Sequence, residues 1–199
     1  MGASVQTYRL SFSTGGLFVA ESAELASRYL QDRDWQLVST HARETNSLQF
    51  RKSTSTERTV RELIARLKML SEQELEWLVE ESPSIQSLVL WLAVCRLYLF
   101  VAEFMAEMVQ ERFSAYRFDL THDDFDAFLD RKAEWHAEVE ALTVSTRKKI
   151  RQILFRMMRE AGILTSDNRI SAPVPTASAS ILRDSLDDSE RAFVPGWRL

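Results

Sequence analysis

The chain has 199 residues, of which 45% are hydrophobic and 27% charged, so it is long enough to bury a core and does not have the composition of a disordered tail. Only five glycines and four prolines are present, and because sheet proteins depend on these residues for their turns, the composition favours an all-α fold. Cys95 is the one cysteine, which excludes an internal disulfide and a cysteine zinc site, and the N-terminus lacks a basic-then-apolar signal pattern, so we expect a cytoplasmic location.

The first half of the chain is predicted to form helices over residues 21–31, 35–41, 57–70 and 72–80. The Ser/Thr cluster at 53–56 offers Ser55 or Thr56 as the N-cap of the third helix. Ser71 and Glu74 have the spacing of a capping box for the fourth helix, which Ser82-Pro83 then ends.

The longest apolar stretch, residues 85–109, has the hydropathy of a membrane span but is interrupted by Arg96, Glu103 and Glu107. At about 100° per residue these three charges fall within roughly 40° on one stripe of a helix. A lipid-facing span does not carry charges near its middle, so we predict no membrane insertion. The stretch is interpreted as one long central helix running to about residue 113, whose polar stripe either fixes the helix register or lies half-exposed under the tail.

In the second half, Thr121 is the predicted N-cap of an acidic helix that runs to about residue 141 and places Trp135 on its apolar face. Thr143 or Ser145 caps a last long helix that ends at Gly162, and residues 163–171 have the pattern of a small hairpin. We therefore expect a helical bundle domain over residues 1–165 and a C-terminal extension over residues 166–199, with short helices that pack on the bundle.

No recognisable catalytic, metal-binding or cofactor-binding motif is present. The three histidines have no metal-ligand spacing, and an acidic cluster at 119–126 lacks the glycine of a calcium loop. Acidic residues in a first helical turn complement the helix dipole, which is the interpretation we give this cluster. We predict no catalytic residues, no metal and no cofactor, and a protein that works by binding and is not an enzyme.

Charge is distributed unevenly behind the net charge of −4. Residues 143–165 hold six basic residues and one acidic residue, a net charge of +5, whereas residues 119–140 hold eight acidic and two basic residues. On a helix the apolar residues of 150–161 fall within about 100° and the basic residues spread over about 160° on the other side. Cations in a first turn oppose the helix dipole, so this helix start suits an anion such as phosphate. The candidate contacts are Arg147, Lys148, Lys149, Arg151, Arg156 and Arg159.

A second basic group, formed by Arg51, Lys52, Arg58 and Arg61, surrounds the Ser/Thr cluster at another predicted helix start. The two groups could engage one nucleic-acid duplex through its phosphates, largely without base readout. The alternative is that the basic helix packs beside the acidic helix, so that the charges pair within the chain.

Several segments, taken in order, carry a resemblance to a known family. They are Ser13-Thr14-Gly15-Gly16-Leu17, Glu21-Ser22 leading to Tyr29-Leu30 and Asp34-Trp35, Arg58 to Leu67, Trp91 to Arg96 with Phe100 to Phe104, Phe125 to Trp135, and the most specific stretch, Ser145 to Leu164. Together they span about residues 7–165 and resemble the BrxA family, a small component of bacterial BREX phage-defence systems.

The resemblance implies an all-helical fold similar to the transcription-antitermination factor NusB, and binding of double-stranded DNA together with other BREX proteins in antiviral defence. It transfers no catalytic residues. The leading hypothesis is a non-catalytic DNA-binding accessory component that gives phage resistance. Two alternatives stay open: a protein-interaction subunit whose basic face docks an acidic partner, and an RNA-binding, NusB-like factor.

Overall fold

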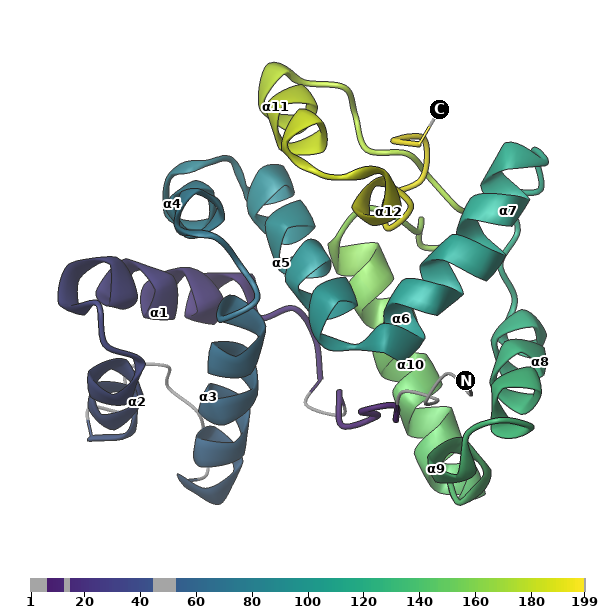
Figure 1. Ribbon diagram of the computed structural model, residues 1–199, viewed down its shortest axis with the longest axis horizontal. Helices are drawn as coiled ribbons and strands as arrows, with labels where there is room; N and C mark the ends of the chain where they lie inside the picture. Colours follow the sequence, from purple (N-terminus) through teal and green to yellow (C-terminus); the bar gives the residue numbers. More distant parts are fainter. Residues whose placement is uncertain (1–6, 13–14, 45–52, 199) are drawn as a thin grey trace, which may run out of the picture. The chain divides into compact units, whose positions relative to one another are not determined.

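The computed structural model describes residues 7–12, 15–44 and 53–198 (Figure 1). They form two compact units, one over Gly16–Leu97 and the other over the described residues up to Gly15 together with those from Tyr98 onward. The boundary predicted at residues 165 and 166 falls inside the second unit. Within the described ranges all regular secondary structure is helical apart from two isolated β-bridges, so the predicted all-α class is confirmed.

The helices of the first unit follow the predicted order. Ser71 and Glu74 form the predicted capping box, in which Glu74 N donates to Ser71 Oγ at 3.3 Å and Ser71 N donates to Glu74 Oε2 at 2.8 Å. The predicted N-cap at Ser55 or Thr56 is wrong, because the third helix begins at Ser53 and takes the Ser/Thr cluster into its first turn. The elements are α1 (Val19–Asp32), α2 (Trp35–Glu44), α3 (Ser53–Leu67), α4 (Glu72–Glu80) and α5 (Pro83–Leu97).

The core of the first unit is built around α5, against which α1, α3 and α4 pack. Residues 87–95 of α5 are buried without interruption. When a helix is covered on every side, its sequence is a continuous apolar run and lacks the periodic polar positions of an amphipathic helix. The resemblance of this stretch to a membrane span therefore follows from its central position in a protein core.

The prediction of one long central helix is wrong, because α5 ends at Leu97 and Tyr98 takes an extended backbone conformation with φ −117° and ψ 94°. Packing explains the break: the Tyr98 ring is fully buried and meets Phe12 edge-on, with ring centroids 5.2 Å apart. The chain then continues as α6 (Leu99–Glu103), the π-helical η1 (Phe104–Val109) and α7 (Gln110–Ser114). Among the described residues no single helix is long and apolar enough to cross a membrane, and Pro83–Leu97 passes that test only when joined to Leu99–Ser114 across the break.

The three charges of the predicted polar stripe do not form one seam. Arg96 donates to both carboxylate oxygens of Glu74, at 2.8 Å each, and to the Met69 carbonyl oxygen at 3.1 Å. Glu103 and Glu107 instead hold the Lys132 ammonium, at 2.5 and 2.7 Å. Burial opposes the charge of Lys132, but the hydrogen bonds to these two carboxylates outweigh it and raise the pKa of the ammonium group.

The second unit continues with α8 (His122–Ala133), α9 (Ala137–Glu140), α10 (Val144–Glu160), α11 (Ala177–Ser185) and α12 (Asp188–Arg191). The acidic helix is shorter than predicted, and Trp135 lies beyond its end with 75% of its surface exposed, so its placement on the apolar face is wrong. The chain leaves the helix there because His136 is extended and stacks on the Tyr8 ring, with centroids 3.7 Å apart.

The predicted C-terminal features of α10 are confirmed. Gly162 follows the helix with φ 74°, a conformation that favours glycine. The predicted hairpin is present as a single antiparallel bridge between Leu164 and Ile170. Thr165 N donates to the Arg169 carbonyl oxygen at 2.9 Å and Ser171 N donates to the Ile163 carbonyl oxygen at 2.8 Å.

Aromatic rings hold the core of the second unit together. Phe100 and Phe104 each meet Phe125 and Phe128 of α8 edge-on, with centroids 5.2 to 5.8 Å apart. Edge-on pairs are a favoured geometry and add about 0.5–1.5 kcal/mol each beyond the burial of their area. The cluster fixes α8 against α6 and η1, and so positions the surface on which α10 packs.

We expect Arg96→Met to lower the free energy of unfolding by about 3 kcal/mol at neutral pH, because it leaves the buried Glu74 carboxylate without its cation. Burial acts to raise the pKa of Glu74, but hydrogen bonds from Arg96 and Ser71 outweigh it and hold the pKa below its ordinary value. A lowered folded-state pKa contributes stability above the unfolded-state pKa, and this is lost as the pH falls below about 5.

The measurement is urea unfolding of the wild type and of the Arg96→Met variant between about pH 7 and pH 3. The difference between their free energies of unfolding is expected to narrow as Glu74 is protonated. A difference that stays constant over this range would contradict the assignment of the stability to this ion pair.

Candidate nucleic-acid interface

Helix α10 begins with the predicted cap. Thr143 Oγ1 accepts from Thr146 N at 3.2 Å and lies 3.0 and 2.9 Å from the hydroxyls of Ser145 and Thr146. The Thr146 amide and these hydroxyls are therefore already engaged within the chain. An anion at this helix start would be held mainly by side-chain cations.

Helices α8 and α10 lie antiparallel, and their register can be read from three contacts one helical turn apart. His122 meets Phe155 edge-on at 5.0 Å, Asp126 pairs with Arg151, and Asp130 pairs with Arg147 at 2.5 Å. Each step of four residues along α8 is matched by a step of four in the opposite direction along α10.

This register settles which cations of α10 are paired within the chain. Arg147 and Arg151 lie on the flank that faces α8, where both are half-buried, and each has an aspartate partner. The alternative prediction, that the acidic and basic helices pair their charges within the chain, therefore holds for two of the six predicted contacts. Their charge is largely compensated before any ligand arrives.

The other four predicted cations, Lys148, Lys149, Arg156 and Arg159, are exposed and form what we call the basic strip. At about 100° per residue they fall within roughly 100° of arc, over about 17 Å of helix axis. Arg156 pairs with Glu160 at 2.7 Å, and Arg159 donates to the neutral Asn168 Oδ1 at 2.8 Å. Lys148 and Lys149 have no carboxylate partner among the described residues.

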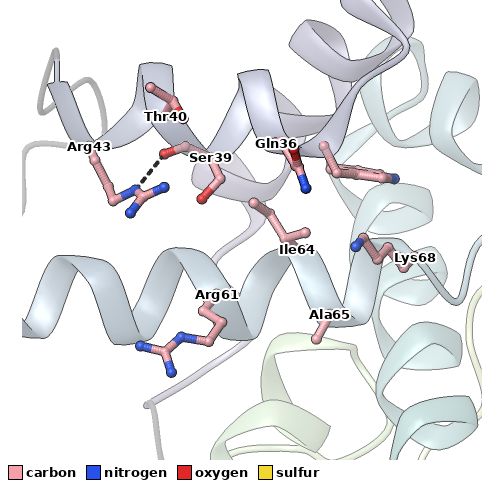
Figure 2. A pocket seen from close by; sticks show the side chains of 9 residues that line it. Gln36, Ser39, Thr40, Arg43, Arg61, Ile64, Ala65 and Lys68 are labelled. Atoms are coloured by element: carbon pink, nitrogen blue, oxygen red, sulfur yellow. Dashed lines mark hydrogen bonds between the residues drawn. The ribbon is translucent and has the colours of Figure 1, made fainter.

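The second predicted group is only partly within the described residues. Arg51 and Lys52 lie outside them, and Arg58 and Arg61 are exposed on α3. Arg61 lines a pocket of about 540 Å³ between α2 and α3, and Arg58 does not line it (Figure 2). Of the two members that the structure describes, Arg61 therefore has the pocket residues as neighbours and Arg58 lies outside the pocket.

Sequence reasoning missed two further cations of this pocket, Arg43 and Lys68. In sequence, each of them lies at least one helical turn away from every member of the second basic group. Neither therefore belongs to a local cluster of charge that the sequence would reveal. The available signal was positional, because Arg43 continues the spacing of Gln36, Ser39 and Thr40 along one face of α2.

Comparison with known proteins bears on fold and family. A crystal structure of an uncharacterized protein from Magnetospirillum magneticum is similar over 96% of this chain and 99% of that one, with a TM-score of 0.78 and 19% sequence identity, which shows a shared fold. A search of curated proteins finds no match. The family model for BrxA matches residues 6–183, so the chain belongs to the BrxA family and is a BREX-associated protein.

Proposed function

We propose that the protein is a non-catalytic accessory component of a BREX-type antiphage defence system that binds double-stranded DNA through the phosphate backbone. The observation that carries the proposal is the basic strip, on which Lys148 and Lys149 are exposed with no carboxylate partner among the described residues. Membership of the BrxA family supplies the link to BREX systems.

Exposed lysines of this kind act as point charges on flexible stems and suit phosphates. The strip presents no aromatic side chain and one exposed amide, that of Gln152, so its chemistry favours phosphate contacts over the reading of base edges. Binding by such a surface is largely independent of sequence and weakens as salt rises, because each neutralised phosphate releases counterions.

We expect the double variant Lys148→Gln/Lys149→Gln to weaken binding to duplex DNA and to reduce the slope of log affinity against log salt by about 1.8, since each lost phosphate contact removes about 0.9. The measurement is a titration of one labelled duplex by fluorescence anisotropy at several salt concentrations.

The matched control is Arg117→Gln/Arg183→Gln, which removes the same charge from two arginines of the second unit that pair with Glu111 and Asp184 outside the strip. The control is expected to keep the wild-type slope. An unchanged slope in the lysine variant, or an equal reduction of the slope in the control, would refute the assignment of the basic strip as the DNA contact.

We expect Asp130→Asn to strengthen binding to the same duplex, because it releases the Arg147 guanidinium, now 2.5 Å from the aspartate, toward the phosphates. One added phosphate contact corresponds to roughly a fivefold to tenfold gain near 0.1 M salt. Asp188→Asn removes the same charge from the pair with Arg191 on α12 and serves as the control. Equal gains in the two variants would point to net charge alone and count against Arg147 as a latent contact.

A second candidate function, docking of a partner protein of the same defence system, is favoured by two exposed apolar side chains, one after the end of α8 and one at the start of α10. Trp135 is 75% exposed and Val144 is 69% exposed. Tryptophan is enriched among the residues that dominate protein interfaces, and large apolar side chains on a surface are common at such sites.

For this candidate, Trp135→Ala is expected to abolish co-purification of a BREX partner in nuclease-treated lysate and to leave duplex affinity within about twofold of wild type. Loss of DNA binding with retained co-purification would instead assign Trp135 to the nucleic-acid surface. An RNA-binding role is tested in the same assay, because a structured RNA that displaces the duplex at lower concentration than unlabelled duplex would favour it.

A further inference from the structure

The pocket between α2 and α3 is a concave site formed by one face of each helix. Residues 35, 36, 39, 40 and 43 line it from α2, and residues 61, 64 and 65 of α3 line it with residue 68 of the turn that follows, in each case at the spacing of a single helical face. Its volume of about 540 Å³ lies within the range of roughly 300–1,000 Å³ that is usual for small-molecule sites.

The start of α2 is held in place by two contacts beside the pocket. Asp34 Oδ1 accepts from Gln36 N at 2.7 Å at the start of the helix. Tyr29 stacks on the Trp35 ring at 4.0 Å with an interplanar angle of 9°, and Tyr29 is not among the lining residues. The indole is thus fixed by the Tyr29 ring, and Trp35 is one of the residues that line the pocket.

The charged residues that the structure describes in the pocket are all positive. Arg43, Arg61 and Lys68 line it, none of its described lining residues is acidic, and none of the three cations has an ion pair with another described residue. Arg43 Nε donates to the Ser39 carbonyl oxygen at 3.0 Å, which orients the guanidinium, and its terminal nitrogens have no bond to another described residue. Three cations around one hollow, without an ion pair among the described residues, create a site for an anion.

The two ends of the pocket differ in their lining, because both arginines stand at one end and the apolar Ile64 and Ala65 lie toward the other together with Lys68. Figure 2 shows Arg43 and Arg61 reaching from the two facing helices toward one end, with Ile64, Ala65 and Lys68 extending toward the other. The hydroxyls of Ser39 and Thr40 lie with the arginine end, and Gln36 provides an amide further along. A ligand that fits both parts has an anionic group at one end and a flat, partly apolar group at the other.

We propose that this pocket binds a nucleotide, with its phosphate between Arg43 and Arg61 and its base against Trp35 and Ile64. Arginine forks match phosphate oxygens in bidentate geometry, and an indole or an aliphatic side chain provides a surface for a base. The nucleotide is either free in solution or the 5′-phosphorylated end of a single strand, since both present the same groups. The site lies in the first unit, shares no residue with the basic strip and does not depend on the proposed function.

The test is calorimetric titration of the full chain with ADP, with inorganic phosphate, and with a short 5′-phosphorylated deoxythymidine oligomer. ADP is expected to bind the wild-type protein at least tenfold more tightly than inorganic phosphate. Arg43→Gln and Arg61→Gln are each expected to weaken ADP binding about tenfold or more, because each removes a charge-assisted hydrogen bond. Both arginines are exposed, so thermal unfolding is expected to be unchanged.

Two controls separate this site from other basic surfaces. Arg28→Gln removes a cation of the first unit that pairs with Asp32 outside the pocket, and Lys148→Gln/Lys149→Gln removes charge from the basic strip. Both are expected to bind ADP as the wild type does. Tighter binding of the oligomer than of ADP, lost with Arg43→Gln, identifies a strand end as the source.

Three results would overturn the proposal. They are no binding of ADP or of the oligomer to the wild type, equal affinity for ADP and inorganic phosphate, or unchanged ADP binding in the doubly substituted Arg43→Gln/Arg61→Gln protein. Each can occur while the basic strip still binds duplex DNA, so failure of this inference and failure of the proposed function are distinguishable.

Discussion

The antiparallel register of α8 and α10 is the constraint on which the electrostatics of the second unit depend. Asp126 and Asp130 meet Arg151 and Arg147 one helical turn apart, while Phe155 packs under the same helix. A slip of one residue along α10 would rotate its faces by about 100° and bring different cations toward the aspartates. The edge-on contact of Phe125 with Phe155, with centroids 6.4 Å apart, joins the buried faces of the two helices and opposes that slip.

The basic helix itself could be predicted from the sequence, because its apolar spacing, Thr143 cap and terminal Gly162 are local features, and the structure has all of them. The division of its cations could not be predicted. Arg147 and Lys148 are neighbours in sequence, yet one is half-buried against Asp130 and the other is exposed. That difference arises because a second helix packs against one flank of α10. The composition and periodicity of α10 do not predict which flank that is.

In the fold as well, features that depend on neighbouring residues could be predicted, and features that depend on tertiary packing could not. Capping residues and Ser82-Pro83 predict the limits of α4 and the start of α5, because short-range hydrogen bonds and backbone restriction decide them. The break at Tyr98 has no such signal, since tyrosine continues a helix readily in isolation. Burial of its ring against Phe12, more than eighty positions away in sequence, makes the extended conformation favourable. Long-range packing therefore determines the break at Tyr98, which helix propensity does not predict.

Shape separates the two basic surfaces of the chain, although their charges are alike. One helix presents the basic strip, so its cations spread along about 17 Å of a convex surface and match an extended polyanion. The cations of the pocket come from α2, from α3 and from the turn after α3, and they line a hollow of about 540 Å³ beside Trp35, which matches a small ligand. Positive charge alone does not select a ligand. The curvature of the surface that carries the charge does, and it depends here on whether cations follow one helix or face each other across two.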